Sequence, residues 1–368
     1  MPFDRSRPFN DLPPLPPQAD IETKPVLRAA IRAARKLAEL KQAGELVPDQ
    51  SVLINTIPLL EAQVSSEIEN IVTTADKLFR LASNEKIETD PATKEALRYR
   101  TALHRGFKAI AKRPVCTNTA ANVCRTIRNV EVDIRATPGT FIGNPRTKEV
   151  LYTPPDGPDR IRTLLANWER FINEATQTDP LIRLAVMHYQ FEAIHPFTDG
   201  HGRTGRVLNI LFLIQEGLLQ IPVLYLSRYF LRNRPRYYRL LRGVTEEQAW
   251  EPWILFMLEA LEQTAQWTGN KVRAIRHLLE ETCAFVRARR PKVYSRELVE
   301  MTFVQPYCRI ANLTDAGIAK RQTASVYLKA LADIGVLQEE KVGREKLFLH
   351  PKFLGLLTTD NNRFDPYT

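Results

Sequence analysis

The twelve residues HPFTDGHGRTGR, from His195 to Arg206, carry side chains suited to phosphoryl chemistry. His195 could accept a proton from a hydroxyl that attacks phosphorus. Asp199 is a hard oxygen ligand that suits a Mg²⁺ already bridging phosphates. Arg203 and Arg206 stand three residues apart, so they can share one helical face and hold different phosphates.

Glycine is the other recurring residue of this stretch. Gly200, Gly202 and Gly205 of this loop are predicted to let backbone N–H groups converge on an anion at the start of the following helix. The stretch contains no lysine and differs from the P-loop pattern, GxxxxGK followed by Ser or Thr. Together these residues predict transfer from a Mg²⁺-nucleotide to a hydroxyl by positioning and charge neutralisation.

Three histidines raise zinc as an alternative. His188 lies seven residues before His195 on an apolar helical face and is predicted to be a hydrogen-bonded core histidine. The spacing of His188, His195 and His201 fits neither HExxH nor a zinc finger. A metal-dependent hydrolase is therefore disfavoured.

Helical patterns flank the stretch on both sides. Before it, Asp179 and Pro180 supply an N-cap and a first-turn proline for PLIRLAVMHYQFEAI. After it, RVLNILFLIQEGLL is apolar on nearly all sides and is predicted to lie in the centre of a helical bundle. The segments TFIG and EVLYT predict a small β-hairpin.

We expect a mainly α protein with three regions. Residues 1–90 hold a proline-rich arm and a helical part, and residues 91–290 hold the catalytic core with the hairpin. Residues 291–368 read as a winged helix-turn-helix, because helical segments precede the ribbon-like QEEKVGREKLFLH. A chain ending near Arg290 is expected to keep its chemistry.

Composition and charge set broader bounds. The chain has 368 residues, of which 44% are hydrophobic and 26% charged, as in soluble proteins with more than one domain. We expect no membrane partner, since no stretch of about 18 apolar residues occurs and the N-terminus does not resemble a secretory signal. Four cysteines without a CxxC pair suggest free thiols in the cytoplasm. The net charge of +10 permits nucleic acid, nucleotide or acidic protein partners without choosing among them.

The stretch resembles the signature of the Fic family, HPFx(D/E)GNGRxxR, and matches every fixed position except His201, where the family has asparagine. SSEIENIVTT resembles the family's inhibitory motif (S/T)xxxE(G/N) through Ser65, Glu69 and Asn70. TPGTFIGN and YTPP resemble its flap hairpin, and a C-terminal winged helix is a common companion. The resemblance implies a Fic-type helical bundle that transfers AMP from ATP to a Tyr, Thr or Ser hydroxyl of a target protein.

The resemblance also implies roles for individual residues. His195 is the general base, Asp199 holds Mg²⁺, and Arg203 and Arg206 hold phosphates of ATP. Glu69 pairs with Arg206 and blocks the productive ATP pose. The flap holds a target segment as an added strand along Thr140, Phe141, Ile142 and Gly143. The implied nucleotide site comprises Gly200, His201, Gly202, Arg203, Thr204, Gly205, Arg206 and Tyr238.

Inhibition of this kind is also consistent with the spacing of the residues. Ser65 and Glu69 are four residues apart, so they lie on one helix face and can project together into a site. Opening such a clamp needs only a few kcal/mol. The asparagine of relatives is expected to help hold the α-phosphate, so His201 should weaken transfer and His201→Asn should raise it.

A second function class is a nucleotide-sensing DNA-binding regulator with a weakened Fic site. His201 and the basic residues Lys320 and Arg321 favour this class, whereas the intact His195 favours the enzyme. The segment TASVYLKALADIGVL has one basic residue, Lys329, which is sparse for phosphate contacts. Self-modification, a homodimer and removal of AMP through the inhibitory glutamate are further hypotheses.

Overall fold

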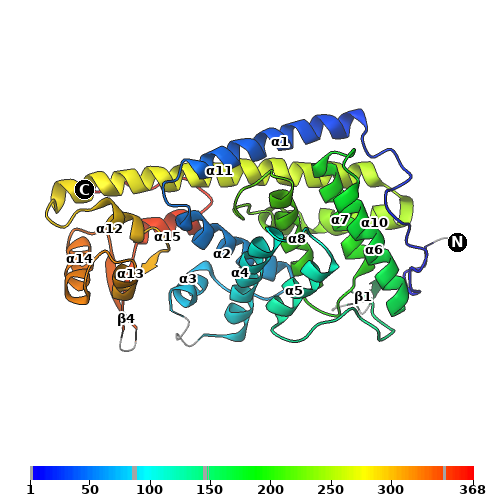
Figure 1. Cartoon of the computed structure of the whole chain (residues 1–368), viewed down its shortest axis with the longest axis horizontal. Coiled ribbons are helices and arrows are strands. Elements are labelled where there is room, and N and C mark those ends of the chain that lie inside the picture. Colours follow the sequence, from blue (N-terminus) through cyan, green and yellow to red (C-terminus); the bar gives the residue numbers. More distant parts are fainter. Residues whose placement is uncertain (1–2, 85–88, 144–146, 148, 343–344) are drawn as a thin grey trace.

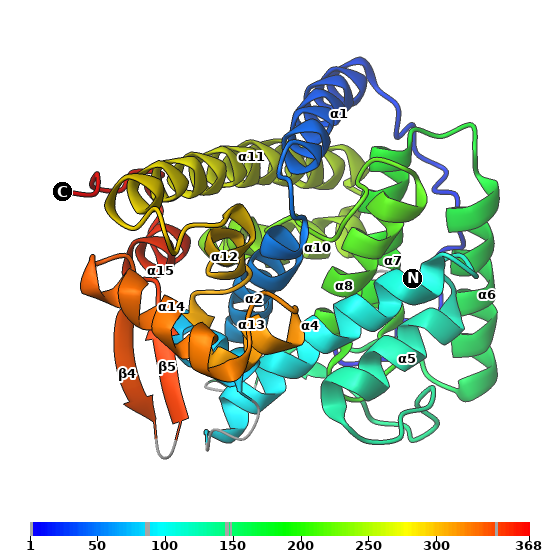
Figure 2. The same ribbon diagram turned by 60° about the vertical axis from the view of Figure 1, so that its left-hand side comes forward.

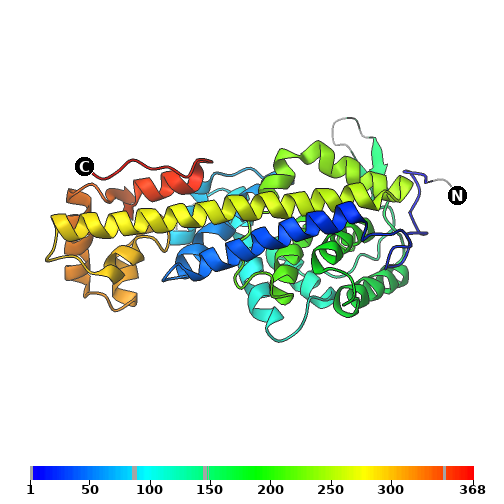
Figure 3. The same ribbon diagram turned by 90° about the horizontal axis from the view of Figure 1, so that it is seen from above.

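The computed structural model describes residues 3–84, 89–143, 147, 149–342 and 345–368. Two helices run along one side of the molecule, α1 (Lys24–Glu45) and the long α11 (Trp250–Arg289). Figure 3 shows them side by side. Val26, Leu37 and Leu40 of α1 are fully buried, so its apolar face holds it in place.

The central helices form a bundle beneath this pair (Figure 1). Within it, α8 is apolar on nearly every side and its residues are almost all buried, as the sequence predicts for a central helix. Asp179 caps α7 by accepting a hydrogen bond from the backbone N–H of Leu181 at 2.8 Å, also as predicted. The bundle helices are α2 (Ser51–Ile68), α3 (Ala75–Ser83), α4 (Pro91–Ile110), α5 (Thr117–Arg128), α6 (Pro158–Glu174), α7 (Pro180–Ile194), α8 (His201–Gln215), α9 (Ser227–Arg232) and α10 (Arg234–Glu247).

The hairpin forms where the sequence predicts it. Strand β1 (Ile142–Gly143) pairs antiparallel with β2 (Val150–Tyr152), and residues 144–146 and 148 between them lie outside the described part. The N-terminal arm packs against the same end of the molecule. The backbone N–H of Phe9 donates to the Thr153 carbonyl oxygen at 2.9 Å.

The C-terminal region lies at the far end of α11 (Figures 1 and 2). Its three strands form an antiparallel sheet in the order β3-β5-β4, in which β4 and β5 make the ribbon that the sequence indicates. The elements, in chain order, are α12 (Arg296–Met301), β3 (Tyr307–Cys308), α13 (Ile310–Asp315), α14 (Arg321–Asp333), β4 (Gln338–Val342), β5 (Glu345–Leu349) and α15 (Pro351–Thr358).

Two further features bear on the sequence predictions. All four cysteines are unpaired. Among the described residues, no helix has both the length and the apolar character that a bilayer span requires.

Candidate active site

The loop that joins α7 to α8 is shorter than the sequence predicts. The glycines of the motif predict a loop that continues to Arg206. His195 ends α7 in the left-handed conformation with φ of 49°, and Gly200 caps α8 with φ of 74°. Helix α8 therefore begins at His201, so Gly202 and Gly205 are helical residues rather than loop residues. An anion at this position would face the first turn of α8, where unpaired N–H groups and the helix dipole favour negative charge.

The two helical glycines instead make room for carboxylates. A Cβ atom on Gly202 would stand 2.5 Å from Glu69 Oε1, and one on Gly205 would stand 2.7 Å from Glu192 Oε1. Any larger residue would displace these oxygens. Glycine at these positions therefore allows both carboxylates to lie close to the helix.

Arg206 is fully enclosed by the end of α2. Its Nη2 lies 2.8 Å from Glu69 Oε1 and donates to the Ser65 carbonyl oxygen at 2.8 Å, while its Nε donates to Ser65 Oγ at 2.8 Å. Burial alone would lower the pKa of Arg206, but the Glu69 carboxylate raises it, so the guanidinium stays charged. Asn70 follows in the left-handed conformation and ends this contact segment. Of the three residues of the predicted inhibitory motif, Ser65 and Glu69 therefore contact Arg206 directly.

Arg203 is also held by a carboxylate. Its Nη1 lies 2.7 Å from Glu95 Oε1 of α4, and Glu95 also binds Arg128 Nη1 at 3.0 Å. Arg128 Nη2 in turn lies 2.9 Å from Asp199 Oδ2. Both arginines of the motif are therefore neutralised by carboxylates of the protein, Arg203 by Glu95 and Arg206 by Glu69.

Asp199 suits a Mg²⁺ that arrives with ATP. Its side chain is 57% exposed, and Mg²⁺ commonly takes one or two carboxylates while keeping waters and phosphate oxygens as its other ligands. Within the described ranges, no group of three or more His, Cys, Asp or Glu residues could enclose a metal by itself. Asp199 therefore fits Mg²⁺ once Arg128 releases its carboxylate.

His195 is half-buried, with its ring Nδ1 enclosed, and it is neutral. Burial, and then the neighbouring His201, lower its pKa to about 3, so the imidazole is free to accept a proton at pH 7. Arg135 fixes the backbone around it. The Nε of Arg135 donates to the His195 carbonyl oxygen at 2.7 Å, and its backbone N–H donates to the Pro196 carbonyl oxygen at 3.0 Å.

His201 faces α7. Its ring stacks on Phe191, with centroids 4.5 Å apart and an angle of 17°, and packs against His195 with centroids 4.2 Å apart. Burial lowers its pKa to about 3, so this ring is neutral as well. The histidine that replaces the signature asparagine thus contacts the residue predicted to be the base.

Three family models match the chain: Fic/DOC family N-terminal over residues 27–108, Fic/DOC family over 120–213, and the C-terminal domain of protein adenylyltransferase SoFic-like over 278–353. This chain belongs to the Fic/DOC family.

Curated relatives match the Fic/DOC chain over part of its length. It is 39% identical over 98 residues to a probable protein adenylyltransferase of Aquifex aeolicus, a match that covers 26% of this chain and 27% of that protein. It is 30% identical over 112 residues to the protein adenylyltransferase Fic of Drosophila melanogaster, covering 30% of this chain and 21% of that protein. The chain therefore matches about a quarter of the length of these relatives.

A solved structure shares the fold. The Fic family protein from Desulfovibrio desulfuricans G20 aligns with a TM-score of 0.56 and 17% identity over 89% of this chain and 96% of that chain. At this identity the likeness shows the fold, a mainly helical Fic bundle.

The remaining predicted residues lie on α8, on α10 and in the flap hairpin. Thr204 is buried and donates from Oγ1 to the Gly200 carbonyl oxygen at 2.8 Å, so it closes the first turn of α8. Tyr238 on α10 is 41% exposed and packs edge-on against the buried Tyr237. In the flap, Phe141 is 60% exposed, while Thr140, Ile142 and Gly143 are half-buried.

His188 is a core residue, as predicted. Its Nε2 lies 2.9 Å from the Tyr237 hydroxyl, and its Nδ1 lies 3.1 Å from Asn209 Nδ2. Burial lowers its pKa to about 4, so it is neutral. Both ring nitrogens are thus paired inside the bundle.

Sequence reasoning missed four charged residues of the site, which are Glu95, Arg128, Arg135 and Glu192. Three of them lie at least 60 residues before His195, so local spacing gives no signal for them. Glu192 could have been found, because it stands three residues before His195 on the same helix.

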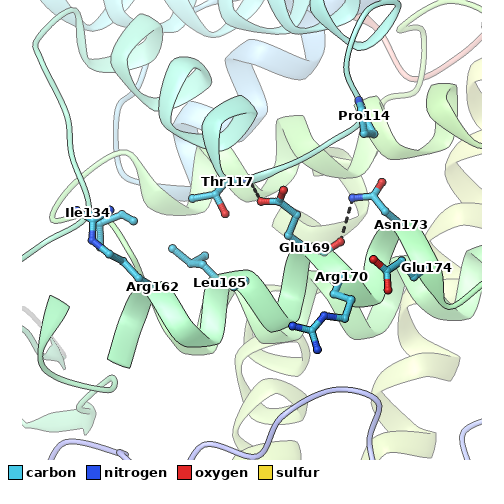
Figure 4. Close-up of a pocket in the computed structure, with 10 residues that line it drawn as sticks. Pro114, Thr117, Ile134, Arg162, Leu165, Glu169, Arg170, Asn173 and Glu174 are labelled. Carbon is cyan, nitrogen blue, oxygen red and sulfur yellow. Dashed lines mark hydrogen bonds between the residues drawn. The ribbon is translucent and has the colours of Figure 1, made fainter. Parts of the chain in front are cut away.

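A separate cavity of about 560 Å³ opens between the start of α5 and α6 (Figure 4). Glu169 lines it and accepts a hydrogen bond from the backbone N–H of Thr117 at 3.0 Å. None of the predicted site residues lines this cavity. This cavity is therefore separate from the candidate site at the start of α8.

Proposed function

We propose that this Fic/DOC protein transfers AMP from ATP to a hydroxyl side chain of a protein. The observation that carries the proposal is the set of groups at the start of α8: His195 packs against His201, Asp199 is exposed just before the helix, and Arg206 is held by Glu69. The curated relatives named above support it, since they bear the name protein adenylyltransferase.

The reaction needs a base and neutralised phosphates. The target oxygen attacks the α-phosphorus of ATP, its proton passes to His195, and the bond from the α-phosphorus to the bridging oxygen breaks to release pyrophosphate. Asp199 would hold Mg²⁺, which neutralises phosphate charge when bound. The backbone N–H groups from His201 onward would receive the negative charge on the α-phosphate.

The contact between Glu69 and Arg206 fits an inhibited resting state. A γ-phosphate that binds Arg206 must displace Glu69, because the guanidinium is enclosed by Glu69 and Ser65. A charge-assisted hydrogen bond of this kind contributes about 1.5–3 kcal/mol, which corresponds to roughly ten- to a hundredfold in rate. Glu69 would therefore keep transfer slow without blocking it.

The flap would present the target segment. Among the described residues β1 pairs with β2 alone, so its other edge is open to an added strand. The exposed Phe141 beside this edge offers an apolar contact. Side-chain recognition by the flap would then bring a hydroxyl towards His195.

Labelling with α-³²P ATP and Mg²⁺ tests the proposal. We expect weak self-labelling in the wild type and roughly ten- to a hundredfold more in Glu69→Gly, because Arg206 is freed. Glu67→Gly is the matched control, since it puts a glycine on the same helix without touching Arg206. No label in Glu69→Gly, either on itself or on proteins of a cell extract, would contradict the proposal.

A role in DNA binding finds less support. Lys320, Arg321 and Lys329 are exposed on or beside α14, but three cations are few for a duplex backbone. The test is the affinity of the full chain for duplex DNA at several salt concentrations. An affinity that hardly changes with salt would favour a protein-docking role instead.

A further inference from the structure

Unpaired polar atoms gather beside the general base. Both ring nitrogens of His201, Nδ1 of His195 and Oε1 of Glu192 are buried and have no hydrogen-bond partner in the described ranges. An unpaired buried polar atom typically costs about 1–3 kcal/mol, so such atoms are rare in native proteins. Their clustering fits a catalytic site, where hydrogen bonds are often long at rest and shorten in the reacting complex.

The ring of His201 is wedged between two rings. Phe191 supports one face, and the imidazole of His195 lies against it at a tilt of 40°. The side chain of His201 is 2% exposed, so its neighbours restrict its rotation. A ring held in this way restricts the orientations open to His195.

Glu192 is placed to hold His201. Its Oε2 lies 3.4 Å from His201 Nε2, and its side chain is 16% exposed. Glu192 lies in the last turn of α7, three residues before His195, which ends that helix. Gly205, one turn after His201, leaves the space that the carboxylate occupies.

We propose that Glu192 and His201 are positioning residues for His195. In the reacting complex the 3.4 Å contact shortens, so that His201 Nε2–H donates to Glu192, and the ring so held fixes the imidazole of His195 for proton transfer. A carboxylate that fixes an imidazole tautomer serves the same end in hydrolase triads, although there the carboxylate contacts the base directly. The idea rests on the proposed function, because it assigns roles within that reaction.

This arrangement changes the expected effect of His201→Asn. The family signature alone predicts that asparagine raises transfer. An asparagine has no ring to stack on Phe191 and His195, so here we expect His201→Asn to lower kcat.

A double-mutant cycle in the Glu69→Gly background tests the pairing. We expect Glu192→Gln and His201→Asn each to lower kcat by about ten- to a hundredfold, as a misplaced base does, with the KM for ATP unchanged. The double variant should equal His201→Asn, because Glu192 acts through His201. Glu169→Gln in the cavity of Figure 4 is the control carboxylate. The proposal would be overturned if the two reductions in kcat multiply in the double variant. It would also be overturned if His201→Asn has a higher kcat than its parent.

A second measurement needs no turnover. The ¹⁵N spectrum of histidine-labelled protein at pH 7 shows which nitrogen of His201 carries the proton, and its signals are identified by their loss in His201→Asn. We expect the proton on Nε2 in the wild type and a changed signal in Glu192→Gln. A proton on Nδ1 would overturn the pairing even if AMP is transferred. A proton on Nε2 without any transfer would support the pairing and count against the proposed function.

Discussion

His195 is the residue on which the proposed chemistry depends most directly. Its imidazole is neutral because burial lowers its pKa to about 3, and its backbone is fixed by Arg135. We expect His195→Ala to reduce labelling of the Glu69→Gly protein by about 10²–10⁴-fold, the usual loss for a general base. The unfolding temperature should change little, because the substitution removes a ring of the candidate site and not a residue of the apolar core. Labelling near the parent rate in a folded variant would show that another group is the base.

Motifs and helical spacing give predictions for this candidate site only among residues that are close together in the chain. The loop from His195 to Arg206 and the pair Ser65 and Glu69 were found by motif and helical spacing, and the structure brings Arg206 against both members of the pair. Glu95 and Arg128 were not found, because a lone charge on a helix looks like a solvated one until the fold brings it to Arg203 or Asp199.

At the scale of elements, prediction worked where local signals agree with packing. Asp179 and Pro180 mark the start of α7, and the structure begins the helix at Pro180. The start of α8 was placed too late, since glycines usually favour loops. Tertiary packing overrides that preference, because Gly202 and Gly205 let Glu69 and Glu192 lie against the helix.

Gly205→Ala should therefore separate helix propensity from function. Alanine favours a helix interior by roughly 0.5–1 kcal/mol over glycine, but its Cβ would stand 2.7 Å from Glu192 Oε1. We expect kcat to fall about tenfold because the carboxylate is displaced from His201. Gly355→Ala in α15 is the control, since nothing lies within 4 Å of its added Cβ. An unchanged kcat in Gly205→Ala would mean that Glu192 need not lie at that position.

At the scale of the whole molecule, buried histidines make stability depend on pH. Burial lowers the pKa of His188 to about 4 and those of His195, His201 and His350 to about 3, all below the value of about 6.5 in the unfolded chain. Between these values the unfolded state binds more protons, so stability falls as pH falls through this window, by up to about 1.4 kcal/mol per histidine and pH unit. Glu61, whose pKa burial raises to about 7, acts in the opposite direction, but it is one group against four.

We expect the unfolding temperature to drop between pH 7 and pH 5. His350→Asn should make the drop smaller, because asparagine does not titrate and can still accept the hydrogen bond that His350 receives from the Phe353 backbone N–H. Thermal unfolding followed by circular dichroism at pH 7, 6 and 5 gives both slopes. A temperature that rises on acidification would show that Glu61 outweighs the histidines.

The C-terminal region is connected to the candidate site through α3. The Tyr307 hydroxyl donates to Asp76 of α3, and Arg80 Nη1 of α3 lies 2.8 Å from Glu340 Oε2. These contacts hold the C-terminal region against α3. Helix α3 begins six residues after Glu69, and its position therefore constrains the inhibitory contact.

We expect the double variant Tyr307→Phe, Glu340→Gln to raise self-labelling several-fold, because each lost hydrogen bond is worth about 1 kcal/mol and α3 is then free to draw Glu69 from Arg206. Glu339→Gln is the control, since Glu339 pairs with Lys346 within the sheet. We would measure the labelling rate with α-³²P ATP and the unfolding temperature of each variant. Faster labelling at an unchanged unfolding temperature indicates release of Glu69, whereas a lower unfolding temperature indicates loss of overall stability. Unchanged labelling would mean that these two contacts do not hold Glu69 against Arg206.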